Sequence, residues 1–324
     1  MKNLLSIPFF LLIITYCKAQ SPDYTQITNN LLFTNPAFAG TKICPRLITG
    51  YRNKILSLGS AYQTFYASFD QYIDEVKGDI GITFVNDIQS KGVVKNITAG
   101  IIYAKDINIT SKLTLKLALQ GEYLNHSVNT EQLSYPDMID PIYGFIYKSE
   151  EPVISSQFHK ANLSAGVLAY SEKQYFGISL FNINEPTSTI ASKNYLLQRK
   201  ISLHYAYNFK YRPGNISEKN AINILPNILL FNQGKSTQLL YGVNFTKNFI
   251  MSGISIKQNI GTNFDSFNLM IGFVQKKFKF AYNCDLSLTR VSSSIFDIHE
   301  ASLTYFFNCV EKKKINKAIN CPGI

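Results

Sequence analysis

Tryptophan is absent from this sequence of 324 residues, cysteine occurs only five times, and charged residues make up 16% of the chain. Five cysteines in a chain of this length exclude a small disulfide-dense domain. The hydrophobic share of 46% excludes an intrinsically disordered chain, which combines low hydrophobicity with high charge. No apolar run of about 18 residues follows the N-terminus, which excludes a polytopic helical membrane protein. A large soluble β protein and a transmembrane β-barrel remain.

Motifs for chemistry are also missing. The four histidines are dispersed, and the sequence contains no CxxC pair, GxSxG elbow or phosphate-binding glycine loop. We therefore expect no enzyme activity, no metal site and no cofactor. His204 lies on the polar face of an expected strand, where it is either a ligand facing a lumen or a hydrogen-bonded filler. The net charge of +11 comes without a basic helix or an RNA-binding signature, so nucleic acid is not an expected partner.

The N-terminus has the pattern of a secretory signal peptide. Lys2 gives a positive start, Leu4–Ile14 is mainly apolar, and Cys17-Lys18-Ala19 places small residues before a cut. Residues 1–19 are therefore predicted to be a signal peptide. Acylation of Cys17, as in a lipoprotein, is the weaker alternative because the bulky Tyr16 precedes it.

The rest of the chain alternates with a period of two, which predicts strands with two different faces. In 199–210, one face is apolar and the other mainly polar. The apolar face carries Ile201, Leu203, Tyr205, Tyr207 and Phe209, and the other carries Lys200, Ser202, His204, Ala206, Asn208 and Lys210. Similar alternation predicts 14 strands, near 45–54, 59–71, 78–88, 94–106, 111–126, 160–170, 174–183, 196–210, 221–232, 235–247, 248–259, 264–275, 276–288 and 296–308. Pro226 lies inside one of them and lacks a donor, so a bulge or kink is expected there.

The lengths of the connections favour a membrane barrel. The two longest, 127–159 and 184–195, both follow odd-numbered strands and so emerge on the same side, as the outer loops of outer-membrane barrels do. Lipid offers no hydrogen-bond partners, so a sheet within it must close. We predict an all-β fold, a 14-stranded antiparallel transmembrane β-barrel over 45–308 in an outer membrane. A soluble two-sheet sandwich, which gives the same alternation, is the alternative.

Two stretches lie outside the predicted barrel. Segment 20–44 has no alternation and contains Asn35-Pro36-Ala37-Phe38-Ala39-Gly40, in which Asn-Pro favours a turn. It is predicted to be a plug in the barrel mouth, or else a plain turn before the first strand.

Segment 309–324 is predicted to be a periplasmic tail. Because the periplasm is oxidising, a disulfide between Cys309 and Cys321 is plausible. Cys44 and Cys284 then remain, and either could be free. The tail also concentrates positive charge, which is expected to meet an acidic periplasmic partner or solvent. This cluster comprises Lys312, Lys313, Lys314 and Lys317.

These features resemble the PorP/SprF family of Bacteroidota outer-membrane proteins, which belong to the type IX secretion and gliding system. The matching pieces are Lys18-Ala19-Gln20 at the signal, the Asn35–Gly40 block, the strand Tyr62–Asp70, the start Gly78–Ile82, the segment His299–Tyr305, and the lysine-rich tail with Cys321-Pro322.

The resemblance implies a FadL-like barrel with an N-terminal plug in the outer membrane of a Gram-negative cell. It also implies a role in secreting a large adhesin or cargo protein and holding it at the cell surface. The partners would be the C-terminal domain of that protein, other type IX secretion components and outer-membrane lipid. An outer-membrane transporter of small solutes, FadL-like or porin-like, is the alternative function.

Overall fold

The computed structural model describes residues 26, 28–42, 44–54, 62–131, 133–150, 155–190, 193–212, 221–260, 264–287, 296–308 and 321–322. The predicted signal peptide and the lysine cluster of the tail lie outside these residues. None of the helices in the described ranges has the length and apolarity to cross a bilayer.

Strands dominate the described chain. The long strands are β1 (Arg46–Lys54), β2 (Tyr62–Ile73), β3 (Gly78–Gln89), β4 (Val94–Thr110), β5 (Leu113–Asn129), β8 (Ser155–Tyr170), β9 (Gln174–Phe181), β12 (Lys200–Tyr207), β14 (Ile222–Gln233), β15 (Ser236–Lys247), β16 (Ile250–Asn259), β17 (Phe264–Val274), β18 (Phe278–Ser287) and β19 (Phe296–Phe306). The short strands are β6 (Ile139–Asp140), β7 (Gly144–Phe145), β10 (Thr187–Ile190), β11 (Lys193–Leu196) and β13 (Phe209–Tyr211). The helical elements are α1 (Leu31–Thr34) and the 3-10 turns η1 (Pro36–Phe38), η3 (Ser90–Gly92) and η4 (Pro136–Met138).

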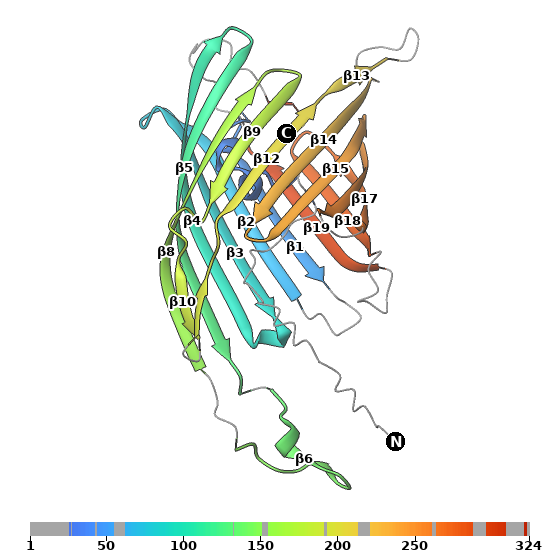
Figure 1. The fold of residues 1–324 in the computed structure, drawn as a ribbon. Coiled ribbons are helices and arrows are strands. Elements are labelled where there is room, and N and C mark those ends of the chain that lie inside the picture. The colour runs from blue at the N-terminus through green and yellow to red at the C-terminus, as the bar shows by residue number, and fades with distance from the viewer. Residues whose placement is uncertain are drawn as a thin grey trace, which may run out of the picture.

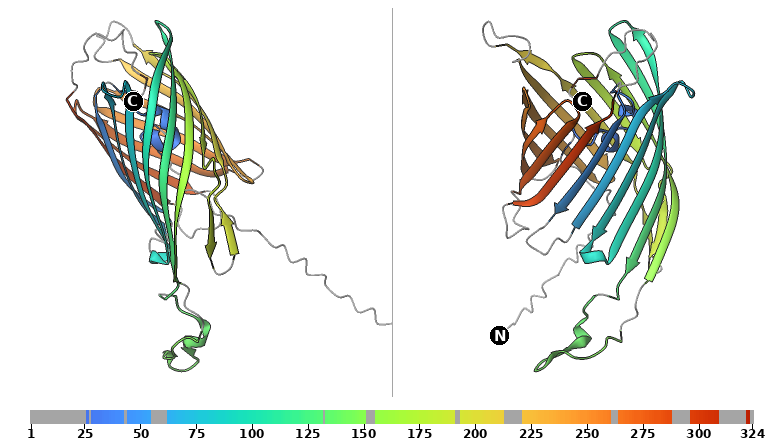
Figure 2. Two further views of the ribbon diagram at one scale, coloured as in Figure 1. Left: turned by 90° about the vertical axis from the view of Figure 1, so that its left-hand side faces the viewer. Right: turned by 180° about the vertical axis from the view of Figure 1, so that it is seen from behind.

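The long strands form one closed antiparallel barrel (Figures 1 and 2). Each pairs with the next long strand along the chain, and β1 pairs with β19 from Arg46 opposite Phe306 to Lys54 opposite Ile298. Strand β13 continues the line of β12, so the ring has 14 strands. Every edge is thereby paired, as a lipid environment requires. The predicted fold class is confirmed, and each of the expected strands is present.

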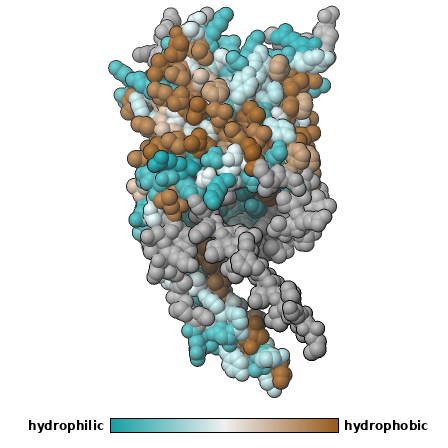
Figure 3. Space-filling view, viewed as in Figure 1, coloured by the Kyte–Doolittle hydropathy of each residue, from teal (hydrophilic) through white to brown (hydrophobic). Residues whose placement is uncertain are grey.

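The two faces of the strands have the predicted chemistry. On β12, Ile201 and Leu203 are exposed, whereas Ser202 and His204 between them are buried. Outward side chains elsewhere are large and apolar, and Leu119 and Ile271 are 69% and 63% exposed. Figure 3 shows apolar side chains gathered over the wall of the barrel, with a more polar surface toward the end from which β6 projects. The outer wall therefore suits lipid, and polar side chains line the lumen.

The two ends of the barrel differ in the length of their connections. At one end, the strands are joined by the short turns 74–77, 111–112, 171–173, 248–249 and 275–277, with 212–221 the longer exception. The other end carries the long connections that contain β6, β7, β10 and β11, and the β6 connection extends well beyond the barrel (Figure 1). Because outer-membrane barrels have short periplasmic turns, we call the first the periplasmic end and the second the outer end.

Pro226 does not produce the expected bulge. Its strand β14 pairs with β15 through Pro226 opposite Val243 without a change of register. The effect appears on the other neighbour, where pairing stops after Ala206 opposite Asn227 and resumes at Phe209 opposite Ile224 in the same register. Proline has no N–H to donate, so the ladder is interrupted there and β13 is separated from β12.

Candidate functional site

The segment before β1 lies inside the barrel, and we call residues 26 and 28–42 the lumen segment (Figures 1 and 2). Its apolar side chains are buried against the inner wall, with Leu32 and Phe38 almost fully enclosed. The cluster that they form comprises Leu31, Leu32, Ala37, Phe38, Ala39, Ile102, Ala104, Ala118, Leu168, Tyr170, Tyr175, Ala206, Leu225 and Cys321. The lumen segment thus gives this barrel an internal core.

Asn35 fixes the middle of the lumen segment to the wall. Its Oδ1 accepts a hydrogen bond from the backbone N–H of Ala37 at 2.8 Å, which caps η1, and Pro36 opens that turn. Its Nδ2 donates to the carbonyl oxygens of Val167 (3.0 Å) on β8 and Ile178 (3.1 Å) on β9. The Asn35 side-chain oxygen thus satisfies a backbone N–H of its own turn, and the two hydrogens on Asn35 Nδ2 bind the turn to the wall.

Two glycines in the wall make room for this anchor. A Cβ at Gly166 would lie 2.0 Å from Asn35 Oδ1, and one at Gly177 would lie 2.3 Å from His204 Nε2. The His204 ring packs against Phe38, with ring centroids 5.2 Å apart. His204 therefore belongs to the packing around the lumen segment.

A buried ion pair holds the next turn. Arg46 donates to Asp70 through Nε and Nη2, both at 2.9 Å, and the two residues are directly opposite on β1 and β2. Asp70 Oδ2 also accepts from the backbone N–H of Gly40 at 2.8 Å. Gly40 has a φ of 66°, and a Cβ there would lie 1.8 Å from Asp79 Oδ1. Only glycine fits this conformation and this close approach.

A second buried charge cluster lies beside the first. Lys116 Nζ on β5 donates to the carbonyl of Ala39 at 2.8 Å and to Asp79 Oδ2 at 2.6 Å, and it lies 3.2 Å from Asp106 Oδ1. The Lys116 side chain is fully buried. A buried cation with these partners is satisfied, but removal of either charge leaves the other uncompensated.

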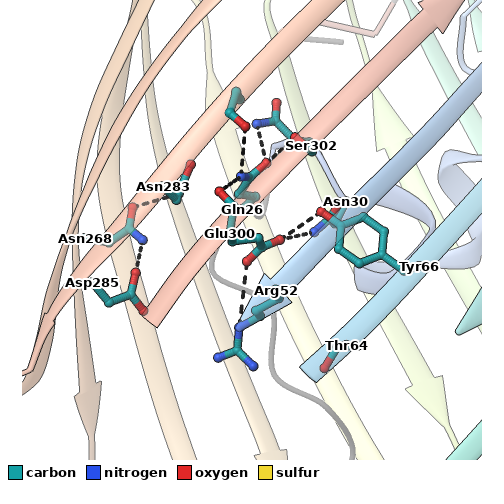
Figure 4. Close-up of polar contacts among 12 residues, drawn as sticks. Gln26, Asn30, Arg52, Thr64, Tyr66, Asn268, Asn283, Asp285, Glu300 and Ser302 are labelled. Atoms are coloured by element: carbon teal, nitrogen blue, oxygen red, sulfur yellow. Dashed lines mark hydrogen bonds and ion pairs between the residues drawn. The ribbon is translucent and has the colours of Figure 1, made fainter. Parts of the chain in front are cut away.

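Glu300 on β19 holds the other end of the lumen segment (Figure 4). Its Oε1 accepts from Asn30 Nδ2 at 2.6 Å and from the Tyr66 hydroxyl at 3.0 Å, and Arg52 Nε lies 3.9 Å from its Oε2. Gln26 Nε2 donates to the Glu300 carbonyl at 3.0 Å. These partners come from β1, β2 and the lumen segment, so Glu300 connects all three to its own strand β19.

The free space inside the barrel is uneven. Beside Gln26 and Thr28, where Asn244 Nδ2 donates to Thr28 Oγ1, the space is only about 20 Å³. This is enough for about one water molecule. At the periplasmic end of β14–β19 a cavity of about 1270 Å³ opens. Thr28 and Asn244 line both spaces, so the lumen segment borders the large cavity on its inner side.

The long outer connection folds into a small hairpin of its own, which we call the outer hairpin (residues 133–150). Asp140 Oδ1 accepts from the backbone N–H groups of Ile142 and Tyr143, at 2.8 and 2.9 Å, and the Tyr147 hydroxyl donates to Asp140 Oδ2. The Ser149 hydroxyl donates to Asp137 Oδ2 at 2.7 Å. These bonds hold its backbone in a defined shape while its large apolar side chains face outward.

The structure brings some of the predicted site residues together and separates others. Asn35, Pro36, Ala37 and Gly40 are all buried within the lumen segment. The predicted disulfide between Cys309 and Cys321 is contradicted, because Cys321 is a free thiol, as is Cys284. Cys44 is the described cysteine that is disulfide-bonded. Cys321 instead packs in the apolar cluster around Phe38.

The charged residues that hold the lumen segment were not predicted from the sequence; they are Arg46, Asp70, Asp79, Lys116 and Glu300. Each is a charged residue on the inward face of a strand, and Lys116 alternates with apolar leucines in the sequence. Charges at such positions indicate buried partners. Their pairing, however, joins residues from 24 to 270 positions apart and depends on the register of the strands.

A family model described as type IX secretion system membrane protein PorP/SprF matches residues 16–305 of the chain. No curated protein has a matching sequence. Among solved structures, the CymD monoaromatic hydrocarbon channel is similar at 10% identity, over 88% of this chain and 93% of the channel, with a TM-score of 0.43. The Acinetobacter baumannii outer membrane protein Omp33 is similar at 6% identity, over 82% and 99%, with a TM-score of 0.44.

Proposed function

The chain belongs to the PorP/SprF family of type IX secretion system membrane proteins, and from this premise we propose that it captures a secreted protein at the cell surface. In this proposal the barrel is the outer-membrane anchor, and its outer loops bind the C-terminal domain of a secreted adhesin or other cargo. It acts by binding, not by catalysis.

The outer hairpin is the observation that carries the proposal. Ile142, Tyr143 and Phe145 are 83%, 75% and 65% exposed, although each is large and apolar. Exposed apolar clusters on a folded surface mark interaction sites. Aromatic side chains on a preorganised loop are the usual anchors of such sites, since little conformational freedom is lost on binding.

The filled lumen supports binding over solute transport, which is the alternative function. A transporter needs a continuous path, whereas the lumen segment occupies part of the interior, with Leu32 and Phe38 almost fully buried. Hydrogen bonds hold this segment to strands on opposite sides of the barrel, including Val167 on β8 and Glu300 on β19. The lumen segment is accordingly proposed to be a plug.

The periplasmic side is proposed to contact other components of the secretion system. The tail cluster of Lys312, Lys313, Lys314 and Lys317 gives this side four positive charges within six residues. Such a cluster attracts acidic surfaces over roughly a Debye length, about 8 Å in physiological salt. The tail is therefore the proposed contact with an acidic periplasmic partner.

Deletion of the gene tests the function directly. We expect loss of surface display of one large secreted protein, the first candidate being one encoded beside this gene. Surface display is measured by antibody labelling of intact cells, and secretion by the amount of the protein in the medium. Normal display of every large secreted protein in the deletion strain would contradict the proposal.

Substitution of the outer hairpin tests the proposed contact. Ile142→Ser, Tyr143→Ser and Phe145→Ser together remove the exposed apolar side chains and leave the Asp140 turn intact. Surface display should fall while the amount of folded barrel in the membrane stays unchanged. Ile260→Ser is the matched control, since Ile260 is 57% exposed in the connection after β16 at the same end of the barrel. Equal display in both variants would exclude the hairpin as the contact.

A further inference from the structure

The cavity at the periplasmic end of β14–β19 is large. Its volume of about 1270 Å³ exceeds the range of roughly 300–1,000 Å³ that is usual for small-molecule pockets. It lies between the periplasmic ends of β14–β19 and the two ends of the lumen segment, from which Thr28 and Lys42 contribute to its wall. Leu225 and Met251 line it as well, and the narrow space beside Thr28 adjoins it, since Thr28 lines both.

The charge of this cavity has one sign. Among the described residues that line it, four are lysines and none is Asp or Glu. Lys276 and Lys277 lie in the turn 275–277, and Lys279 follows on β18. Lys42 Nζ lies 5.2 Å from the centre of the Phe306 ring. Burial, followed by the charge of the neighbouring Arg46, lowers the pKa of Lys42, so this mouth already favours the loss of positive charge or the arrival of an anion.

The rest of the lining suits a polypeptide. Six side-chain amides line the cavity, and each amide both donates and accepts, as a peptide backbone does. They are Asn208, Asn223, Asn244, Asn248, Gln275 and Asn308. Phe249, Phe278, Phe306 and Phe307 add apolar surface around them.

We propose that the cavity binds an acidic polypeptide segment of another protein from the periplasmic side. The Lys276, Lys277 and Lys279 ammonium groups pair with its carboxylates, and the side-chain amides bond its backbone. The segment must come from a different chain, because the tail of this chain carries Lys312, Lys313, Lys314 and Lys317 and adds positive charge. This site lies at the opposite end of the barrel from the outer hairpin and has different chemistry. The proposal for the cavity can therefore be disproved while the proposed cargo contact stands.

The test uses the full-length protein in detergent and a fluorescent peptide that alternates Glu with Gly and Asn. Fluorescence anisotropy should show binding that weakens as NaCl is raised, because exposed charge pairs are screened. A peptide of the same length with Gln in place of Glu should not bind. Lys276→Gln, Lys277→Gln and Lys279→Gln together should lower the affinity about tenfold, which is the expected sum of weak charge pairs at the exposed Lys276 and Lys277 and at the half-buried Lys279.

Matched variants separate the cavity from charge in general. Lys91→Gln, Lys148→Gln and Lys235→Gln remove the same charge from exposed positions at the outer end, and they should leave the affinity unchanged. Substitution of Gln for Lys312, Lys313, Lys314 and Lys317 should reduce it less than the cavity variant does. The proposal is overturned if the tail variant alone abolishes binding or if the Gln peptide binds as well as the Glu peptide. It is also overturned if an acidic oligosaccharide, oligogalacturonate, displaces the labelled Glu peptide more effectively than unlabelled Glu peptide does.

Discussion

At the scale of single residues, the lumen segment is held in place by charged side chains that have no access to water. Lys116, Asp79, Arg46 and Asp70 are each almost fully buried, yet their ion pairs also bond the backbone of the lumen segment at Ala39 and Gly40. Burial of an ion pair does not by itself stabilise a protein. What these pairs supply is a specific position, because only one placement of the Ala39–Gly40 turn satisfies both of them.

Loss of Lys116 should release this turn. Lys116→Met leaves the Asp79 carboxylate without its cation and the Ala39 carbonyl without its donor, a change that costs about 3–5 kcal/mol for a buried pair. Cys321 reports the release, since it packs in the same cluster as Ala39 and burial raises the pKa of its thiol. In a Cys284→Ser background, maleimide should label Cys321 faster in the variant than in the parent.

The control for this measurement is Lys105→Met, which removes a lysine from an exposed position on the neighbouring strand β4. It should leave the labelling rate unchanged. If Lys116→Met also labels at the parental rate while the barrel remains folded, Lys116 does not hold the lumen segment.

A substitution at Gly166 tests the Asn35 anchor by steric crowding, without removal of any hydrogen-bonding group. A methyl group at this position would lie 2.0 Å from Asn35 Oδ1, so Gly166→Ala must displace the anchor, at a cost of about 1–3 kcal/mol for overpacking. Gly121→Ala is the matched control, because nothing lies within 4 Å of a Cβ there. The midpoint of unfolding in denaturant measures both.

A second substitution identifies the cause. Asn35→Ala in the Gly166→Ala background removes the amide that the new methyl group meets, and it should recover part of the lost stability. If the double variant is instead destabilised by the sum of the two single effects, the residues do not interact.

At the scale of elements, the sequence was informative where one face met lipid and the other met the lumen. The 12-residue strand β2, for example, ends within two residues of its predicted end, because alternation continues to the turn 74–77. Where both sides of a strand are polar, the pattern weakens. The prediction for β8 accordingly began at 160, but the strand begins at Ser155, and its extra residues pair with β5 beyond the apolar band.

The elements that the sequence did not predict are those fixed by side-chain hydrogen bonds instead of periodicity. The β6–β7 pair is two residues long and depends on the Asp140 turn. The lumen segment is similar, since α1 has only 4 residues and η1 only 3, too few to show a helical period. The Asn35–Gly40 block was visible as a motif, but its partners on β2, β5, β8 and β9 become adjacent only after the barrel closes.

The outer hairpin should depend on pH through Asp140. The hydrogen bonds from the backbone N–H groups of Tyr143 and Ile142 lower the pKa of this carboxyl below its ordinary value of 3.8. A lowered folded pKa means that the ionised carboxylate stabilises the turn above the unfolded pKa, and that this contribution is lost as pH falls through the folded value. Hydrogen-exchange protection of Ile142 and Tyr143, corrected for intrinsic rates, should therefore be constant near neutral pH and decline only in acid.

Asp140→Asn is the control for this dependence. Its amide oxygen can still accept both hydrogen bonds but cannot titrate, so its protection should not follow pH in the same range. Identical pH profiles for the parent and the variant would assign the effect to another group.

At the scale of the whole molecule, the composition follows from a barrel with a segment of its own chain packed inside. The low charged share of 16% reflects a wall that faces lipid on one side and an interior in which each charge needs a partner. A barrel of 14 strands is wide enough to leave an open interior, since about eight strands already hold side chains throughout and 16–18 leave an aqueous channel. If the lumen segment is the plug that we propose, it decides whether this interior is a channel or a solid anchor.

Conductance is the measurement that distinguishes these two states. If the lumen segment is the plug that we propose, the parent protein should carry little ion current in planar bilayers, because Leu32 and Phe38 of this segment are packed inside the barrel. Deletion of residues 28–40 removes the obstruction and should produce a lasting open conductance. Deletion of the outer hairpin, which lies beyond the barrel, should leave the protein as closed as the parent. If the protein without residues 28–40 does not fold, Lys116→Met provides the same test, because a loosened lumen segment should open the barrel transiently. A parent protein that conducts as well as either variant would show that the lumen segment does not close the barrel.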